Sequence, residues 1–276
     1  MGNAITTAAG FLLASHGGIN LGLLLATLAG LSLVIACGCV LNNYFDRDID
    51  TLMERTKDRV LVRGLISARN VFVYAAILGI FGFVILLRYT NLITTAVAFF
   101  GLLMYVIAYT LWAKRRFVHS TVIGGFAGAV PPVVGYCAVS NSLDVTAIIL
   151  FVILILWQIP HFFAIGLYRL DDYTAARIPI VPVKRGTVAT KIQMLYYISA
   201  FVVAVSLLTL FGFTGYLYLS VMSMIGLAWL GLCIRGFWAI TADDTKHWAR
   251  KMFLFSLIVI VMFCVMVGID RIWIGR

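Results

Sequence analysis

The sequence predicts an all-α membrane protein with about nine helices that cross or enter a bilayer around a central cavity. Of its 276 residues, 63% are hydrophobic and only 12% are charged, and the mean hydropathy is +1.04. Soluble domains are about half apolar and a quarter charged, so this chain has too little polar surface to face water. Its apolar stretches are long and continuous, which is typical of membrane helices, whereas a membrane barrel shows short alternating strands.

Nine apolar segments follow one another, at about 4–15, 21–41, 71–87, 92–113, 120–138, 146–168, 193–213, 215–234 and 252–269. A helix needs about 20 apolar residues to cross the hydrocarbon core, so the first segment is too short to span. We expect it to be a truncated first helix. Because it lacks a basic start, it does not resemble a secretory signal. The chain 1–276 is expected to form a single transmembrane domain, built from a four-helix half and a five-helix half.

The basic residues lie in alternating linkers. Of the 21 lysines and arginines, all but Arg88, Arg271 and Arg276 follow the second, fourth, sixth or eighth segment. The positive-inside rule places these linkers in the cytoplasm, so we expect a multi-pass protein of the bacterial inner (plasma) membrane. Topology and contact with anionic lipid then explain the net charge of +10, and no nucleic-acid partner is expected.

The acidic residues share the cytoplasmic side with the basic ones. Of the 11 aspartates and glutamates, all but Asp144 and Asp270 lie there, although membrane orientation does not require them. Carboxylates crowded at a membrane mouth repel one another unless a cation is bound. Their placement therefore predicts a cation site at the cytoplasmic side.

The first acidic motif leaves the second segment. Asn42, Asp46 and Asp50 recur every fourth residue, so on a continuing helix they form one stripe. Such oxygen ligands suit Mg²⁺, which fills its remaining positions with water and phosphate oxygens. An EF-hand loop is excluded, because Thr51 and Lys57 stand where that loop needs Gly and Glu. A solvated charged helix end and helical ion pairs remain alternatives.

Basic residues follow this motif. Arg55 and Arg59 are four apart with Lys57 between them, and the planar fork of arginine matches phosphate oxygens. Anchoring of the helix end on the cytoplasmic side is the alternative.

A second acidic motif follows the sixth segment on the same side. Asp171 and Asp172 lie there, and if the two motifs face each other they would hold Mg²⁺ and a diphosphate between them. Pro179 and Pro182 predict a break in helical structure and a loop that covers the site. An allylic diphosphate ionises when its leaving group is stabilised, and the resulting cation needs a dry, apolar pocket.

These motifs resemble the UbiA-type intramembrane prenyltransferases, whose motif Asn-x-x-x-Asp-x-x-x-Asp is met by Asn42, Asp46 and Asp50. Longer strings resemble the family in that superfamily that farnesylates haem b; they lie within 42–50, 53–59, 123–132, 157–162 and 168–179. The resemblance implies transfer of a farnesyl group from farnesyl diphosphate to a vinyl group of haem b, with water addition, giving haem O and diphosphate. Haem b is then a substrate and not a prosthetic group, and a haem A-forming enzyme is the expected recipient of the product.

The resemblance also implies a set of site residues. Asp46, Asp50 and Asp172 are implied to be catalytic and, together with Asn42, to hold Mg²⁺. The implied substrate-binding residues are Arg55, Lys57, Arg59, Lys114, Arg115, His161, Arg169 and Tyr173. For Lys114 and Arg115, a topology anchor is the alternative to contact with diphosphate or the haem propionates.

His161 is an ionisable residue inside a spanning segment, which makes it a functional candidate. Three roles are open: ligating the haem iron, orienting the porphyrin, or bonding a neighbouring carbonyl that Pro160 frees.

Two other functions compete with haem farnesylation. The first is a related prenyltransferase that acts on an aromatic or quinone precursor. The second is a transporter or cation channel, because carboxylates in membrane helices also mark ion pathways. The acidic residues sit at loop entrances on one side rather than through the membrane, which disfavours conduction.

Overall fold

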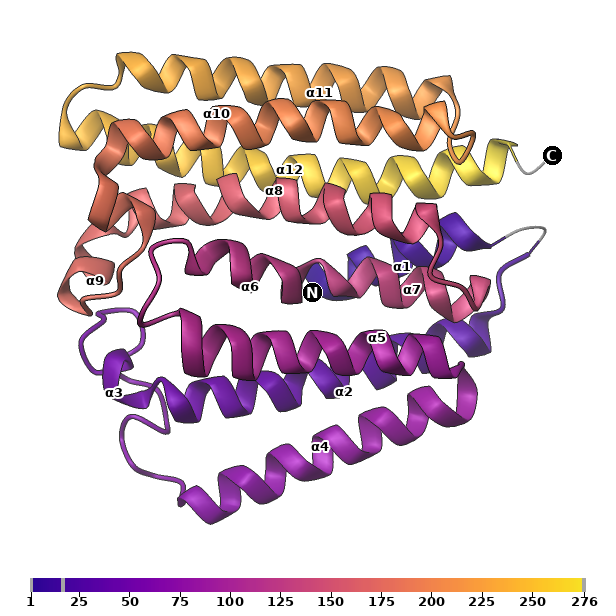
Figure 1. The fold of residues 1–276 in the computed structure, drawn as a ribbon, viewed down its shortest axis with the longest axis horizontal. Helices are drawn as coiled ribbons and strands as arrows, with labels where there is room; N and C mark the ends of the chain where they lie inside the picture. Colours follow the sequence, from indigo (N-terminus) through magenta and orange to yellow (C-terminus); the bar gives the residue numbers. More distant parts are fainter. Residues whose placement is uncertain (1, 16–17, 275–276) are drawn as a thin grey trace.

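The computed structural model describes residues 2–15 and 18–274, without the side chains of 271–274. Within this part of the chain every regular element is a helix, which confirms the all-α prediction (Figure 1). The elements are α1 (Gly2–Ala14), α2 (Leu21–Phe45), α3 (Arg47–Asp50), α4 (Ala68–Tyr89), α5 (Leu92–Leu103), the π-helix η1 (Met104–Ala113), α6 (Ser120–Gly128), α7 (Val130–Ser140), α8 (Val145–Tyr168), α9 (Leu170–Ala175), α10 (Val181–Leu210), α11 (Tyr216–Arg235), the 3₁₀ helix η2 (Gly236–Trp238) and α12 (Ala242–Ile274).

Eight helical stretches in the described residues are long and apolar enough to cross a membrane. Three of them join two elements: α5 with η1, α6 with α7, and α11 with η2. The first helix, α1, has 13 residues and is shorter than a span, as predicted. Each of the nine predicted apolar segments therefore corresponds to a helical stretch.

The segment after the second acidic motif differs from the prediction. Helix α10 begins at Val181, well before the predicted start at 193, so the expected loop around Pro182 is wrong. Proline is tolerated in the first turn of a helix because the first N–H groups have no intrahelical partner. The helix is then interrupted at Gly186, which has a φ of 78°.

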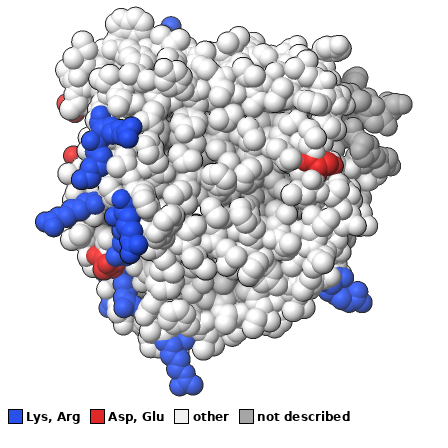
Figure 2. Space-filling view, viewed as in Figure 1, with Lys and Arg blue, Asp and Glu red and all other residues white. Residues whose placement is uncertain are grey.

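The helices form two groups with a third layer between them. In Figure 1, α8, α10, α11 and α12 pack together on one side and α2, α4 and α5 on the other, while α1, α6 and α7 lie between. Short helices α3 and α9 lie at the same end of the bundle. Lysine and arginine side chains gather at that end, and a broad uncharged surface separates it from the opposite end (Figure 2). This distribution matches the predicted one-sided placement of the basic linkers.

Two glycines allow α1 and α7 to approach closely. A Cβ on Gly10 would collide with the backbone of Pro132, and one on Gly135 would collide with the carbonyl of Thr7. Small residues at helix contacts are the usual means of close packing in membranes, where lipid tails remove the hydrophobic drive to associate. The position of α1 in the bundle therefore depends on its close contact with α7.

We expect Gly135→Ala to lower the free energy of unfolding by about 1–3 kcal/mol, because the added methyl group overpacks the α1–α7 contact. Thermal unfolding in detergent would measure it. Gly231→Ala is the matched control, since an added Cβ there meets nothing within 4 Å. Equal melting temperatures for the two variants would contradict the role of the glycine contact.

Candidate functional site

The first acidic motif keeps its helical register across a bend. Helix α2 ends at Phe45 and α3 begins at Arg47, yet the amide of Asp46 donates to the carbonyl of Asn42 (2.9 Å) and that of Asp50 to Asp46 (2.8 Å). The predicted stripe is therefore present, and all three of its side chains line one cavity.

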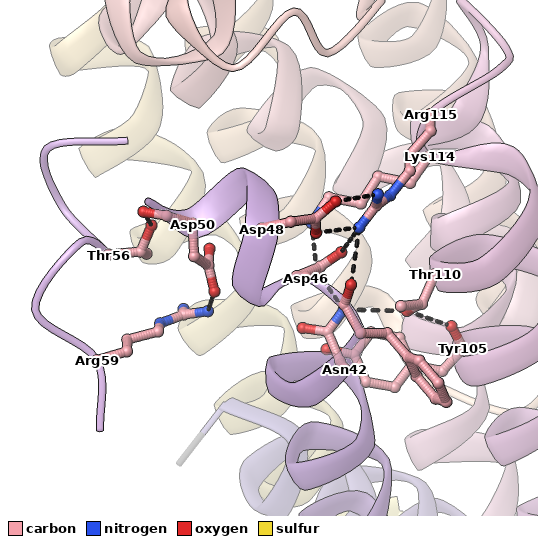
Figure 3. A network of polar contacts seen from close by, with 11 residues as sticks. Asn42, Asp46, Asp48, Asp50, Thr56, Arg59, Tyr105, Thr110, Lys114 and Arg115 are labelled. Atoms are coloured by element: carbon pink, nitrogen blue, oxygen red, sulfur yellow. Dashed lines mark hydrogen bonds and ion pairs between the residues drawn. The ribbon is translucent and has the colours of Figure 1, made fainter. Parts of the chain in front are cut away.

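Asp46 is almost completely buried, with 1% of its surface exposed. Its Oδ2 accepts hydrogen bonds from Lys114 Nζ (2.5 Å) and from Asn42 Nδ2 (2.7 Å), as Figure 3 shows. The amide of Asn42 is itself held by Thr110 Oγ1, 3.0 Å away. The other carboxylate oxygen, Oδ1, is buried and has no hydrogen-bond partner. An unpaired buried carboxylate oxygen is costly, which makes Oδ1 a natural position for a cation.

Asp50 is the second buried carboxylate, with 3% of its surface exposed. Arg59, from the segment between α3 and α4, donates to its Oδ2 at 2.6 Å. The hydroxyl of Thr56 donates to the main-chain carbonyl of Asp50 at 3.2 Å, which ties the same segment to the end of α3. Each buried carboxylate of the motif thus has its own cationic partner (Figure 3).

Asp48 lies outside the cavity. Its carboxylate accepts from both terminal nitrogens of Arg115 at 2.6 Å, and its side chain is 60% exposed. The hydrogen bonds from Arg115 lower the pKa of Asp48, and those to Asp48 raise the pKa of Arg115. Arg115 also donates to the carbonyl of Phe45 at 2.7 Å. This residue therefore ties the end of η1 to the α2–α3 bend and does not line the cavity.

The cavity measures about 470 Å³ and is polar at one end. Asn42, Asp46, Asp50, Arg55, Arg59 and Lys114 line the polar part. The rest is largely apolar and reaches Leu31 and Val34 of α2 and Val130 of α7. From Asp46 to Leu31 the helix rises by about 22 Å, so the cavity follows α2 deep into the bundle. Such a shape suits an anionic head with a long hydrocarbon tail.

The π-helix η1 forms one wall of this cavity. Tyr105 and Tyr109 line it, and their rings stack with centroids 6.3 Å apart. The hydroxyl of Thr110 donates to the carbonyl of Tyr105 (2.8 Å), and the amide of Lys114 donates to that of Tyr109 (2.9 Å). The wider turn of a π-helix, common at functional sites, thereby places Thr110 and Lys114 at the carboxylate end.

The second acidic motif meets the first through apolar packing. Met53, after α3, packs with Ala176, Ile178 and Ile180, which follow α9. Tyr173 of α9 lines the cavity; burial raises its pKa, and the positive charge of Arg55 opposes that rise. The segments that carry the two motifs therefore meet at one end of the cavity, where the second motif contributes Tyr173 and not its carboxylates.

Asp172 does not line the cavity, whereas Tyr173 beside it does. Its side chain is 14% exposed and lies 4.0 Å from Arg169, and neither residue is among those that line the cavity. The cavity contact of this motif is made by Tyr173.

Two other predicted residues also lie away from the cavity. Lys57 is exposed and pairs with Glu54 at 2.6 Å; this hydrogen bond raises the pKa of Lys57. His161 faces α12, where its Nδ1 lies 2.7 Å from the hydroxyl of Ser256. Since that hydroxyl donates to the carbonyl of Phe253 (2.6 Å), it accepts from His161, which leaves Nε2 without the proton. The partner of His161 is thus a hydroxyl on α12 and not a carbonyl freed by Pro160.

Sequence reasoning missed several cavity residues. Gln158 is 4% exposed, lines the cavity and donates to the carbonyl of Leu154 at 3.0 Å. Gln158 is a polar residue inside a spanning segment, as His161 is, so the same criterion would have made it a functional candidate. Tyr105 and Tyr109, which line the cavity, carried no such signal, because a π-helix cannot be distinguished from an α-helix by apolar spacing.

The residues present fit a divalent cation that arrives with its own oxygen ligands. Among the described residues, no group of three or more His, Cys, Asp or Glu side chains is arranged to hold a metal. Two carboxylates and the amide of Asn42 line the cavity end, and Asp46 Oδ1 accepts no hydrogen bond, its nearest cation being Arg115 at 3.9 Å. Mg²⁺ binds few protein oxygens and completes its shell with water and phosphate, so this donor set suits it.

Comparison with known proteins identifies the family to which the chain belongs. The model of the UbiA prenyltransferase family matches residues 3–258, and the chain belongs to this family. It is 50% identical over 269 residues to protoheme IX farnesyltransferase of Sodalis glossinidius (strain morsitans), and 48% identical to protoheme IX farnesyltransferase 2 of Pseudomonas putida (strain W619). Each match covers 98% of this chain and 90% of the relative.

Solved structures share the fold. A digeranylgeranylglyceryl phosphate synthase superposes with a TM-score of 0.79 at 19% identity, covering 96% of this chain and 93% of that one. A UbiA homologue from Archaeoglobus fulgidus bound to GPP and Mg²⁺ gives a TM-score of 0.67 at 14% identity, with coverage of 94% and 95%.

We expect Lys114→Met to lower the free energy of unfolding by about 3 kcal/mol in the presence of EDTA, because Asp46 stays buried and keeps only the more distant guanidinium of Arg115, whose Nη2 lies 3.9 Å from Asp46 Oδ1. The double variant Asp46→Asn/Lys114→Met removes both charges and is expected to recover most of this loss. Denaturant titration in detergent would measure both. An equal loss in the single and double variants would contradict the importance of the buried pair.

Proposed function

We propose that this chain transfers the farnesyl group of farnesyl diphosphate to a vinyl group of haem b, with addition of water, and releases haem O and diphosphate. The observation that carries the proposal is the deep apolar cavity with two buried, cation-paired carboxylates at its mouth, in a chain that is 50% identical to a protoheme IX farnesyltransferase. The UbiA homologue bound to GPP and Mg²⁺ supports a divalent cation and a prenyl diphosphate as the ligands of this fold.

In this proposal the polar end of the cavity binds the diphosphate. Arg55, Arg59 and Lys114 donate to its oxygens, since all three line that end. Asp46, Asp50 and Asn42, together with Asp172 of the second motif, would hold Mg²⁺. Bound there, the ion would supply positive charge for the departing diphosphate without any proton transfer. The tail lies along α2 between apolar walls, which exclude water from the allylic cation.

The reaction then balances as follows. The C–O bond to diphosphate breaks, and the first carbon of the farnesyl chain forms a bond to the terminal carbon of the haem vinyl group. Water adds to the other vinyl carbon and loses a proton, which gives the hydroxyethylfarnesyl side chain. The stacked rings of Tyr105 and Tyr109 line the cavity and offer π-faces to a cationic centre.

Haem b is proposed to bind at the rim. Lys57, Arg115 and Arg169 are not among the residues that line the cavity, and they would meet the two propionates outside it. His161 and Tyr173 would contact the porphyrin. The chain would function as a single domain in the bacterial inner membrane with these loops in the cytoplasm, and a haem A-forming enzyme would take the product.

We expect Asp46→Ala and Asp50→Ala each to reduce haem O formation by about a hundredfold or more, because each removes a carboxylate from the metal site. Extraction of haems after expression, followed by mass analysis, would measure it, and membrane fractionation would check that the variants insert. Asp58→Asn is the matched control, since Asp58 pairs only with exposed Arg63 (3.1 Å). Turnover by either alanine variant at the level of the unchanged chain would contradict the metal–diphosphate assignment. Farnesylation of hydroxybenzoate but not of haem would contradict the acceptor.

Removal of divalent metal is expected to stop the reaction reversibly. Incubation with EDTA should lower diphosphate release from farnesyl diphosphate by about a hundredfold, and added Mg²⁺ should restore it, because the lysine and arginine side chains would not supply the charge that a divalent cation would bring to the leaving group. Unchanged diphosphate release in EDTA would show that the basic residues suffice.

A further inference from the structure

We propose that Lys114 and Arg59 serve as internal counter-ions of the metal-binding carboxylates and transfer to the diphosphate when it binds. Binding of the divalent metal and binding of the diphosphate then depend on each other. This inference rests on the proposed function and adds to it a mechanism by which the empty site excludes metal.

The observation behind it is that both carboxylates are already occupied by cations of the chain. Lys114 Nζ lies 2.5 Å from Asp46 Oδ2, and Arg59 Nη1 lies 2.6 Å from Asp50 Oδ2. The carboxylate side chains are only 1% and 4% exposed. A buried charge is tolerated only with a partner. When no metal or diphosphate is bound, these ion pairs allow the two carboxylates to be buried.

A divalent metal that arrives alone meets an unfavourable site. Its charge would stand beside the ammonium of Lys114 and the guanidinium of Arg59, where solvent screening is weak. It would also compete with them for Oδ2 of each carboxylate, and at Asp46 Oδ1 it would meet the guanidinium of Arg115, whose Nη2 lies 3.9 Å away. Consistent with this, no ready cluster of three metal-binding side chains exists among the described residues.

A diphosphate removes both obstacles. Its oxygens accept hydrogen bonds from Lys114 and Arg59, which line the same cavity end and are the usual phosphate-binding groups. The carboxylates then become free for the metal, and the metal completes its shell with phosphate oxygens. Since coupling between two ligands is reciprocal, the metal must strengthen diphosphate binding by the same factor.

The two cations are placed so that they can move. Arg59 lies on the irregular segment between α3 and α4 with a third of its side chain (33%) exposed, and Lys114 follows the last residue of η1. The exposed pair of Asp48 and Arg115 lies outside the cavity and remains intact in this scheme. That pair holds the α2–α3 bend while the inner pairs exchange.

The test uses the full chain in detergent, with Mn²⁺ as the metal probe and farnesyl thiolodiphosphate as an unreactive substrate analogue. Electron paramagnetic resonance of free Mn²⁺ gives the metal affinity. We expect the analogue to tighten Mn²⁺ binding to the unchanged chain by about tenfold or more. Lys114→Met and Arg59→Leu should each bind Mn²⁺ alone about tenfold more tightly than the unchanged chain and gain less from the analogue.

Matched variants separate the pairs from general charge effects. Arg63→Leu removes one positive charge from the same segment but pairs only with exposed Asp58, so its Mn²⁺ affinity should stay within about twofold of the unchanged chain. Lys114→Arg keeps the charge, so its affinity for Mn²⁺ alone should lie closer to that of the unchanged chain than to that of Lys114→Met. If Lys114→Met does not fold without metal, its recovery of folding on addition of Mn²⁺ alone supports the same conclusion, and Arg59→Leu tests the second pair independently.

Two results would overturn the inference. One is a Mn²⁺ affinity of the unchanged chain that the analogue does not alter. The other is a Mn²⁺ affinity, without the analogue, that is the same in Lys114→Met, Arg59→Leu and the unchanged chain. Coupled binding of Mn²⁺ and the analogue without any farnesylation of haem would support the inference and contradict the acceptor assigned under the proposed function.

Discussion

Burial of two carboxylates inside an apolar bundle is the constraint on which the rest of the site depends. Asp46 and Asp50 have lost almost all contact with solvent, so positive charge must lie within a few ångströms of each. That requirement accounts for Lys114 at the end of one helix and Arg59 on a connecting segment. It also accounts for the amide of Asn42, which supplies a further donor to Asp46. Charge balance, rather than shape alone, determines which segments meet at this end.

The helices of the bundle supply the apolar part of the site. Apolar packing of Met53 against the residues after α9 joins two segments that are far apart in the sequence. The cavity below them is bordered by spanning helices, whose outer faces carry large exposed hydrophobic side chains such as Ile80 and Val203. Lipid on the outside and a dry cavity inside both follow from the same composition. One end therefore offers positive charge to an anion, and the remainder has the apolar lining that suits a hydrocarbon chain.

The sequence was sufficient for the helices and for the first motif, and insufficient for the partners of that motif. Apolar runs and a four-residue repeat depend on local chemistry, so the order of the spans and the stripe of Asn42, Asp46 and Asp50 were predictable. Which cation faces which carboxylate depends on contacts between residues up to 68 positions apart. For the same reason, the orientation of His161 toward α12 and the separate placements of Asp172 and Tyr173 could not be read from spacing.

Helix η1 forms one wall of the cavity and has wider turns than an α-helix. The number of residues in it therefore matters as much as their identity. A π-helical stretch contains one more residue than an α-helix with the same two ends, so its ends are set by a count of residues and not only by side-chain identity. Deletion of a single residue between Met104 and Ala113 would let the stretch continue as a regular α-helix, in which each amide donates four residues back instead of five. The widened turn that places Thr110 and Lys114 beside the first acidic motif would then be lost, although both ends of the wall had been kept.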